Sequence, residues 1–320
     1  MTLAPEATRA AYLAHAGFER EVADWLLLQG LSAPAWHGRL ALSPDPPRTD
    51  HPWALDVWTN PRPLPAPSVR AGADALRAVQ RNWSLEAFAH HRRAALVEAA
   101  LPPLRPRPLA LPGAVVPTGH LGGWTLLRPD LILASPTKTS PFPHGAPLLA
   151  EDREGPPSRA YLKLWEALLR LGRWPGPGET CLDLGAAPGG WTWALAAMGV
   201  ARVTAVDKAP LDPRVAALPN VEARAESAFA LDPAAHPPVD WAFSDVVCYP
   251  ARLLGLVRRW LAAGRAGTLL CTVKFQGPTD HAVAAEFAAL PGARLLHGAQ
   301  NGHELMLAVP GRPPVPGGEV

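Results

Sequence analysis

Four charged residues in the second half of the chain form a chemically coherent set: Lys163, Asp245, Lys274 and Glu304. Methyl transfer to an alcohol requires the hydroxyl to lose its proton as the oxygen attacks the methyl carbon of a sulfonium. A lysine can accept that proton only when burial and neighbouring cations lower its pKa. Lys163 and the sulfonium would be those cations, and Asp245 and Glu304 would hold the ammonium groups in position. The remaining catalysis is alignment of oxygen, methyl and sulfur.

Each of these residues also has a simpler structural interpretation. Lys163 could pair with Glu166 on a solvated helix face. Asp245 could cap the helix that follows it. Lys274 could be the exposed end of a strand and Glu304 a charge at the rim of the domain. Taken singly, Lys163 and Glu304 fit the structural interpretation better, whereas the four residues together favour the catalytic one.

The lysine content adds weight to two of these positions. The chain has 26 arginines and only four lysines, which are Lys138, Lys163, Lys208 and Lys274. Because arginine is used wherever a positive charge suffices, a lysine indicates a role that arginine fills less well. Lys208 directly follows Asp207. For Lys138, which lies in the polar segment PTKTS, we consider contact with a substrate.

A glycine-rich segment, DLGAAPGGW at residues 183–191, joins a predicted strand to a predicted helix. Gly185 permits a tight turn, and Gly189 and Gly190 would let a ligand approach the backbone at a helix N-terminus. Pro188 suits the first turn of that helix. The spacing differs from G-x-G-x-x-G, so the segment does not favour the pyrophosphate of a dinucleotide.

Asp207 narrows the identity of the ligand. It lies 17 residues after Gly190, at the end of the next predicted strand, where a carboxylate commonly binds ribose hydroxyls. A nucleoside without a diphosphate fits both features, and S-adenosylmethionine is such a ligand. A tight strand-to-helix turn that binds no ligand is the alternative, and the presence of Asp207 argues against it.

The elements that must position these residues alternate from residue 158 onward. Apolar runs predict strands at 180–184, 202–206, 239–244, 268–273, 293–296 and 304–309, and helical periodicity predicts helices at 159–171, 191–198, 251–263 and 281–290. This alternation is typical of α/β proteins with a parallel, doubly wound, Rossmann-like sheet. Ligands of such sheets bind outside the carboxyl ends of the strands, where Asp207, Asp245 and Lys274 fall.

The first part of the chain is less regular, because proline interrupts its apolar stretches, as in residues 60–67 and 101–108. We expect helices near 18–29, 69–79 and 85–99, and strand-like runs at 114–116 and 125–133. The densest basic patches are residues 90–93 and 105–107. They could contact RNA phosphates, or they could be a solvated helix face and a loop.

Composition excludes several classes of protein. The chain has 320 residues, of which 48% are hydrophobic and 18% charged, enough for one large or two modest domains. It has no apolar run of about eighteen residues that would span a membrane, and its N-terminus does not resemble a secretory signal. The three cysteines have neither disulfide nor zinc spacing, so we expect reduced thiols in the cytoplasm and no metal. A net charge of +2 neither requires nor excludes a nucleic-acid partner.

Residues 158–309 resemble the FtsJ-type ribose 2′-O-methyltransferases, which carry a Lys-Asp-Lys-Glu tetrad around a DLGxxPGGW turn. The matching segments are PSRAYLKL at 157–164, DLGAAPGGW at 183–191, SD at 244–245, TVKF at 272–275 and HE at 303–304. Within that family, SPFPHGAP at 140–147 and AGFERE at 16–21 resemble the RlmM branch, the 23S rRNA (cytidine-2′-O)-methyltransferases.

The resemblance implies roles for individual residues. Lys274 would be the proton acceptor of the tetrad. The cofactor site would be lined by Gly185, Ala187, Pro188, Gly189, Gly190, Trp191, Asp207, Glu226 and Asp245. Two positions depart from the branch: Glu226 replaces an aspartate near the adenine, and Ala160 replaces a serine that would contact the cofactor.

The resemblance also implies an organisation and a substrate. We expect a smaller α+β, THUMP-like RNA-targeting part at 1–149, a methyltransferase domain at 150–311 and a flexible tail at 312–320. The expected substrate is a cytidine ribose of 23S rRNA. One alternative is 2′-O-methylation of tRNA or of another rRNA site, and a second is a non-catalytic RNA-binding or assembly protein. The sequence does not predict an oligomeric state.

Overall fold

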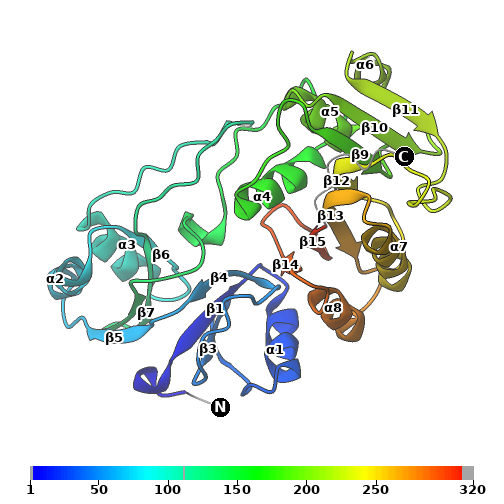
Figure 1. Cartoon of the computed structure of the whole chain (residues 1–320). Helices are drawn as coiled ribbons and strands as arrows, with labels where there is room; N and C mark the ends of the chain where they lie inside the picture. Colours follow the sequence, from blue (N-terminus) through cyan, green and yellow to red (C-terminus); the bar gives the residue numbers. More distant parts are fainter. Residues whose placement is uncertain (1–2, 111, 312–320) are drawn as a thin grey trace. The chain divides into compact units, whose positions relative to one another are not determined.

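The computed structural model describes residues 3–110 and 112–311 and divides into two compact units (Figure 1). Unit 1 comprises residues 1–109 and 115–148, and unit 2 comprises residues 110–114 and 149–320. The predicted tail at 312–320 lies outside the described residues. No helix among the residues that the structure describes is long and apolar enough to cross a membrane.

Unit 2 is built on a seven-stranded sheet with the strand order β11-β10-β9-β12-β13-β15-β14. Its strands are β9 (Thr180–Leu184), β10 (Arg202–Asp207), β11 (Val221–Ala225), β12 (Val239–Ser244), β13 (Ala266–Lys274), β14 (Arg294–Leu296) and β15 (Glu304–Pro310). Strands β9 to β13 are parallel, whereas β15 is antiparallel to both of its neighbours. Because the chain leaves β9 toward β10 and later returns to its other side at β12, the strand order reverses at β9.

Helices between the strands are α4 (Tyr161–Leu171), α5 (Gly190–Ala197), the short α6 (Pro213–Ala216), α7 (Pro250–Ala263) and α8 (His281–Ala288). The predicted apolar stripe Leu162, Trp165 and Leu169 of α4 is buried. Leu162 and Trp165 belong to a core that also includes α5 and the inner strands, with Trp241 and Phe243 stacked on β12. These features confirm the predicted doubly wound, Rossmann-like α/β fold.

Strand β11 and helix α6 were not predicted from the sequence. Strand β11 lies at the edge of the sheet and its residues VEARA are only partly buried or exposed. An edge strand of this kind needs no apolar run, so the pattern that predicts the inner strands is absent from it.

Unit 1 contains two four-stranded sheets. The first has the order β2-β3-β1-β4 and is antiparallel, with β1 (Ala10–Ala14), β2 (Ala35–His37), β3 (Leu40–Ser43), β4 (Ala54–Trp58) and the helix α1 (Glu19–Leu28). The second has the order β5-β8-β7-β6, with β5 (Arg62–Pro65), β6 (Trp83–Leu85), β7 (Gly122–Arg128), β8 (Leu131–Ser135) and the helices α2 (Val69–Val79) and α3 (His91–Ala99). Unit 1 is therefore an α+β structure; its THUMP-like nature stays a prediction.

Several expectations for unit 1 were wrong. The helix predicted at 85–99 begins only at His91, because Leu85 ends strand β6. The run predicted as one strand at 125–133 is the hairpin β7–β8, which turns at Asp130. Residues 114–116 form no strand. The first sheet was missed because a buried, alanine-rich strand such as β1 shows no alternation of apolar and polar residues.

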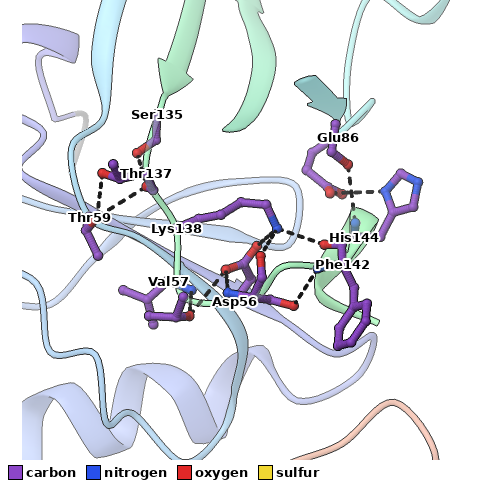
Figure 2. A network of polar contacts seen from close by, with 12 residues as sticks. Asp56, Val57, Thr59, Glu86, Ser135, Thr137, Lys138, Phe142 and His144 are labelled. Atoms are coloured by element: carbon purple, nitrogen blue, oxygen red, sulfur yellow. Dashed lines mark hydrogen bonds and ion pairs between the residues drawn. The ribbon is translucent and has the colours of Figure 1, made fainter. Parts of the chain in front are cut away.

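The substrate contact considered for Lys138 is also wrong, because its side chain is only 1% exposed. Its ammonium lies 2.6 Å from Oδ2 of Asp56 and donates hydrogen bonds to the carbonyl oxygens of Ser140 and Phe142 at 2.7 and 2.8 Å (Figure 2). Asp56 also accepts a hydrogen bond from the amide of Ser140. This buried pair fixes the segment that follows β8 against β4.

Candidate active site

The four charged residues predicted to act together are brought together in unit 2. Lys163 lies on α4, Asp245 directly follows β12, Lys274 ends β13 and Glu304 begins β15. Asp245 and Lys274 meet because both lie at the carboxyl ends of adjacent parallel strands. Glu304 joins them because the antiparallel register of β13 and β15 pairs it directly with Lys274.

Asp245 is the centre of the cluster. One of its carboxylate oxygens lies 3.3 Å from Nζ of Lys163 and 2.9 Å from Nζ of Lys274. The ammonium of Lys274 also donates a hydrogen bond to the backbone carbonyl oxygen of Asp245. On the other side, Nζ of Lys163 lies 3.0 Å from Oε1 of Glu304. The order of contacts is therefore Lys274, Asp245, Lys163, Glu304.

The cluster is shielded from water but not sealed, since its four side chains are between 11% and 18% exposed. Burial alone would lower the pKa of Lys163. The carboxylates of Asp245 and Glu304 outweigh that effect, so that the pKa of Lys163 is raised. Lys163 therefore acts in this arrangement as a fixed cation, and the simpler interpretation of a Lys163–Glu166 pair is wrong. The helix cap by Asp245 is also wrong, because the residue at the cap position of α7 is Tyr249.

Glu166 instead holds the loop that precedes β15, a role that the sequence analysis missed. Its buried carboxylate accepts hydrogen bonds from the backbone amides of Ala299 and Gln300 at 2.9 and 3.0 Å and pairs with Arg170 on the same helix. Within that loop, the side-chain amide of Asn301 donates a hydrogen bond to Oε1 of Glu304 at 3.2 Å. Glu166 thus fixes the backbone that carries one member of the cluster.

The glycine-rich segment forms the predicted turn between β9 and α5. Gly185 has a φ of +80°, and a Cβ atom at this position would lie 2.9 Å from the backbone nitrogen of Val246. Only glycine satisfies both the left-handed conformation and this close approach. Val246 directly follows Asp245, so the turn packs against the backbone that bears the centre of the charged cluster.

Gly190 was expected to let a ligand approach the backbone, and in the structure it also allows close packing of the chain. A Cβ atom at Gly190 would lie 2.4 Å from the hydroxyl of Ser158, so this glycine permits the approach of the segment before α4. Pro188 was predicted in the first helical turn, but it precedes Gly189, the N-cap of α5. Trp191 is buried, and its indole nitrogen donates to the carbonyl oxygen of Ala160 at 2.9 Å.

Two carboxylates follow the neighbouring strands at the same edge. Asp207 ends β10, and its two oxygens accept hydrogen bonds from the amides of Ala187 and Ala209 at 3.1 and 2.9 Å. Each carboxylate oxygen has a further lone pair for a ligand. Glu226 directly follows Ala225, the residue of β11 that pairs with Asp207. Within the described part of the chain, the carboxylate of Glu226 has no hydrogen-bond or ion-pair partner.

Asp183, the first residue of the turn motif, has unusual electrostatics that the sequence analysis did not consider. Its side chain is fully buried, one oxygen accepts a hydrogen bond from Thr192 at 2.7 Å, and the other has no partner among the described residues. Burial raises the pKa of Asp183 to about 7, and the negative charges of Asp245 and Asp207 add to this effect.

This edge of the sheet fits S-adenosylmethionine. The carboxylates of Asp183, Asp207 and Glu226 surround the turn, which disfavours a ligand rich in phosphate. They suit hydroxyl, amino and sulfonium groups, and the unpaired carboxylate of Glu226 is an available acceptor. No group of three His, Cys, Asp or Glu residues in the described ranges could hold a metal ion.

Comparisons with known proteins agree with this geometry. Residues 156–255 match the model of the FtsJ-like methyltransferase family, so unit 2 contains an FtsJ-like methyltransferase domain. The chain is similar to "Ribosomal RNA large subunit methyltransferase M" of Halorhodospira halophila, with 46% identity over 123 residues that cover 38% of this chain and 35% of that protein. The protein of the same name from Azoarcus sp. is 39% identical over 143 residues, covering 43% of this chain and 38% of that protein.

These matches span less than half of the length of either relative. Similar solved structures include an rRNA methylase from Streptococcus thermophilus, with a TM-score of 0.33, 17% identity, and coverage of 43% of this chain and 89% of that chain.

Proposed function

We propose that the chain transfers a methyl group from S-adenosylmethionine to a ribose 2′-hydroxyl of RNA, and that its substrate is a cytidine of 23S rRNA. The observation that carries the proposal is the charged cluster of Lys163, Asp245, Lys274 and Glu304 beside the glycine turn. The names of the similar proteins support large-subunit rRNA as the substrate. The cytoplasm, where that RNA is found, is the proposed location.

The turn and the two following carboxylates would hold the cofactor. Asp207 would accept hydrogen bonds from its ribose hydroxyls, and Glu226 would accept from the exocyclic amine of adenine. The backbone of residues 185–190 would pack against the nucleoside. When bound, S-adenosylmethionine supplies a methyl group on a positively charged sulfur.

Lys274 is the proposed proton acceptor. The 2′-hydroxyl oxygen forms a bond to the methyl carbon as the carbon–sulfur bond breaks, and the hydroxyl proton moves to Nζ of a neutral Lys274. Asp245 fixes that nitrogen through its carboxylate and its backbone carbonyl. Lys163 shares a carboxylate oxygen of Asp245 with Lys274, and Glu304 keeps Lys163 in place.

An exposed hydrophobic pair beside the cluster supports RNA as the substrate. Val247 and Tyr249 lie in the segment between Asp245 and α7 and are 75% and 69% exposed. Proteins that act on unpaired nucleotides commonly stack the bases on aromatic side chains. Tyr249 offers such a surface within four residues of Asp245.

Methylation mapping of total RNA tests the substrate. In RNA from a strain that lacks this chain, a single cytidine 2′-O-methyl mark of 23S rRNA should be absent, and the purified chain should restore it with S-adenosylmethionine. A mark lost from tRNA while 23S rRNA is unchanged would overturn the ribosomal substrate.

Lys274→Arg tests the chemistry, because arginine keeps the charge but does not readily lose a proton. We expect loss of methyl transfer with unchanged cofactor binding. Turnover equal to that of the wild type would contradict the role of Lys274. RNA binding by a wild-type chain that transfers no methyl group would favour the non-catalytic alternative.

A further inference from the structure

Unit 1 contains a hollow of about 660 Å³ that the proposed chemistry does not use. Its walls come from Asn82 and from residues within the segments 103–109, 117–121 and 141–148, and we call it the unit 1 hollow. The first two of these segments lie outside the helices and strands. The volume is within the range of about 300–1,000 Å³ that is usual for sites that bind organic ligands.

The lining of the unit 1 hollow is mainly apolar and stiff. Leu104, Leu109, Phe142 and Leu148 contribute to it, and Leu148 is 49% exposed. Prolines line it at positions 103, 106, 117, 141, 143 and 147. Because proline fixes φ, these walls lose little conformational freedom when a ligand binds.

All ionisable side chains of the lining are arginine or histidine. Arg105 and Arg107 are exposed, and neither forms an ion pair with another described residue. His120 and His144 complete this set, and neither aspartate nor glutamate is among the lining residues. An apolar surface edged by cations complements a chain of flat bases joined by phosphates.

His144 is held at the edge of the unit 1 hollow by two constraints. Its backbone is left-handed, with a φ of 55°, which is uncommon for a residue with a side chain and is often found at functional sites. Its Nδ1 atom lies 3.1 Å from Oε1 of the buried Glu86, while the ring itself is 62% exposed (Figure 2). Figure 2 also shows that the segment of His144 continues from the one fixed by Lys138.

The surroundings of His144 favour its protonated form. The hydrogen bond to Glu86 raises the pKa of His144 above its usual value, against the effect of burial. The charge of Glu98 on α3 also raises it, and that of Lys138 lowers it. A fixed and exposed imidazolium is a suitable partner for a phosphate oxygen.

We infer that the unit 1 hollow binds a single-stranded segment of the RNA substrate, with bases on the apolar lining and phosphates at Arg105, Arg107 and His144. The inference rests on the proposed function, since that function makes RNA the partner. A duplex is a poorer fit because its base faces are stacked on one another, whereas unpaired bases can enter a hollow. Glu86 is a positioning residue for His144.

The test uses the full chain and a fluorescent twelve-nucleotide oligocytidine, with dissociation constants from fluorescence anisotropy at 50 and 200 mM salt. A phosphate contact to a single strand changes the slope of log K against log salt by about 0.7. Removing two contacts with Arg105→Gln/Arg107→Gln should therefore reduce the salt-dependent loss of affinity about sevenfold over this range. The matched control is Arg20→Gln/Arg70→Gln, which removes two exposed charges from helices of the same unit.

A second variant keeps the inference falsifiable if the double variant folds poorly. His144→Asn removes the imidazolium but suits the left-handed backbone. Raising the pH from 6 to 8.5 should weaken oligonucleotide binding by the wild type several-fold more than by His144→Asn, since only the wild type loses a cation at this position. Equal pH dependence, or salt slopes for the Arg105/Arg107 variant that match both the wild type and the control, would overturn the inference.

The outcomes separate this inference from the proposed function. If the oligonucleotide binds through Arg105 and Arg107 but the wild type methylates no RNA, the proposed function fails and the hollow remains a nucleic-acid site. If methylation occurs and the variants bind and methylate RNA as the wild type does, the inference fails alone. Variants that bind RNA normally but no longer bind phosphatidylglycerol vesicles would show that the hollow recognises a lipid surface, which also overturns the inference.

Discussion

Asp183 is expected to make the stability of unit 2 fall as the pH rises. Its carboxyl group has a pKa of about 7 in the folded chain and 3.8 without perturbation, because burial disfavours its charged form. Below pH 4 the group is protonated in both the folded and the unfolded state, so it does not make the free energy of unfolding depend on pH. Between about pH 4 and 7 the unfolded chain releases this proton more readily, so the folded state loses stability as the pH rises.

The size of the effect follows from the two pKa values. A difference of about 3 units at about 1.4 kcal/mol per unit sets an upper limit of about 4 kcal/mol above pH 7. Asp183→Asn removes the titration and leaves an amide oxygen that can still accept the hydrogen bond from Thr192. The variant should therefore be more stable than the wild type at pH 8, by about 2–4 kcal/mol, and should differ little at pH 4.5.

Urea unfolding of both proteins at pH 4.5 and 8, in the absence of cofactor, measures this difference. The decisive quantity is the change with pH in the stability difference between variant and wild type, because any cost of the substitution that does not depend on pH cancels. A difference that is the same at both pH values, or that favours the wild type more at pH 8, would refute the reasoning.

Three further substitutions have definite expected outcomes. Glu166→Gln should weaken the hydrogen bonds that hold the loop before β15 and lower kcat about 10- to 100-fold through a shift of Glu304. The dissociation constant of S-adenosylmethionine should not change. The surface substitution Glu286→Gln is the control and should leave kcat unaltered, so equal kcat values in both variants would contradict the role of Glu166. Lys138→Met should lower the free energy of unfolding by about 3–5 kcal/mol in urea titrations, because it leaves a buried carboxylate unpaired; a loss below about 1 kcal/mol would argue against the buried pair. Tyr249→Ala should raise the KM for RNA about tenfold, equivalent to about 1.4 kcal/mol of base stacking, with cofactor binding unchanged in calorimetry; an unaltered KM would exclude Tyr249 as a stacking surface.

The sequence predicted the inner parallel strands β9, β10, β12 and β13 well because each is a short apolar run that ends at, or is followed by, a polar residue. Strand β12 is such a run, and the rule that ligand groups follow the carboxyl ends of parallel strands placed Asp245 beside Lys274. The same rule could not place Glu304, which begins a strand. Its position depends on the antiparallel register of β13 and β15, and register is set by tertiary pairing.

Local spacing was misleading where a distant partner was available. Lys163 and Glu166 are three residues apart on one helix, which is the spacing of a surface pair, yet each has a partner more than 80 positions away in the chain. Lys138 gives the same lesson, because its partner Asp56 is 82 positions away. Ion pairs and hydrogen bonds between residues this far apart in the sequence cannot be inferred from helical or strand periodicity.

The place of β15 in the sheet has a consequence for the folding of the chain during its synthesis. This strand lies between β13 and β14 and follows both in the chain, so both pairings form only after it has been synthesised. It also carries the last member of the charged cluster at its first residue, Glu304. A nascent chain therefore has an incomplete charged cluster until the segment 304–310 has left the ribosome and paired with β13.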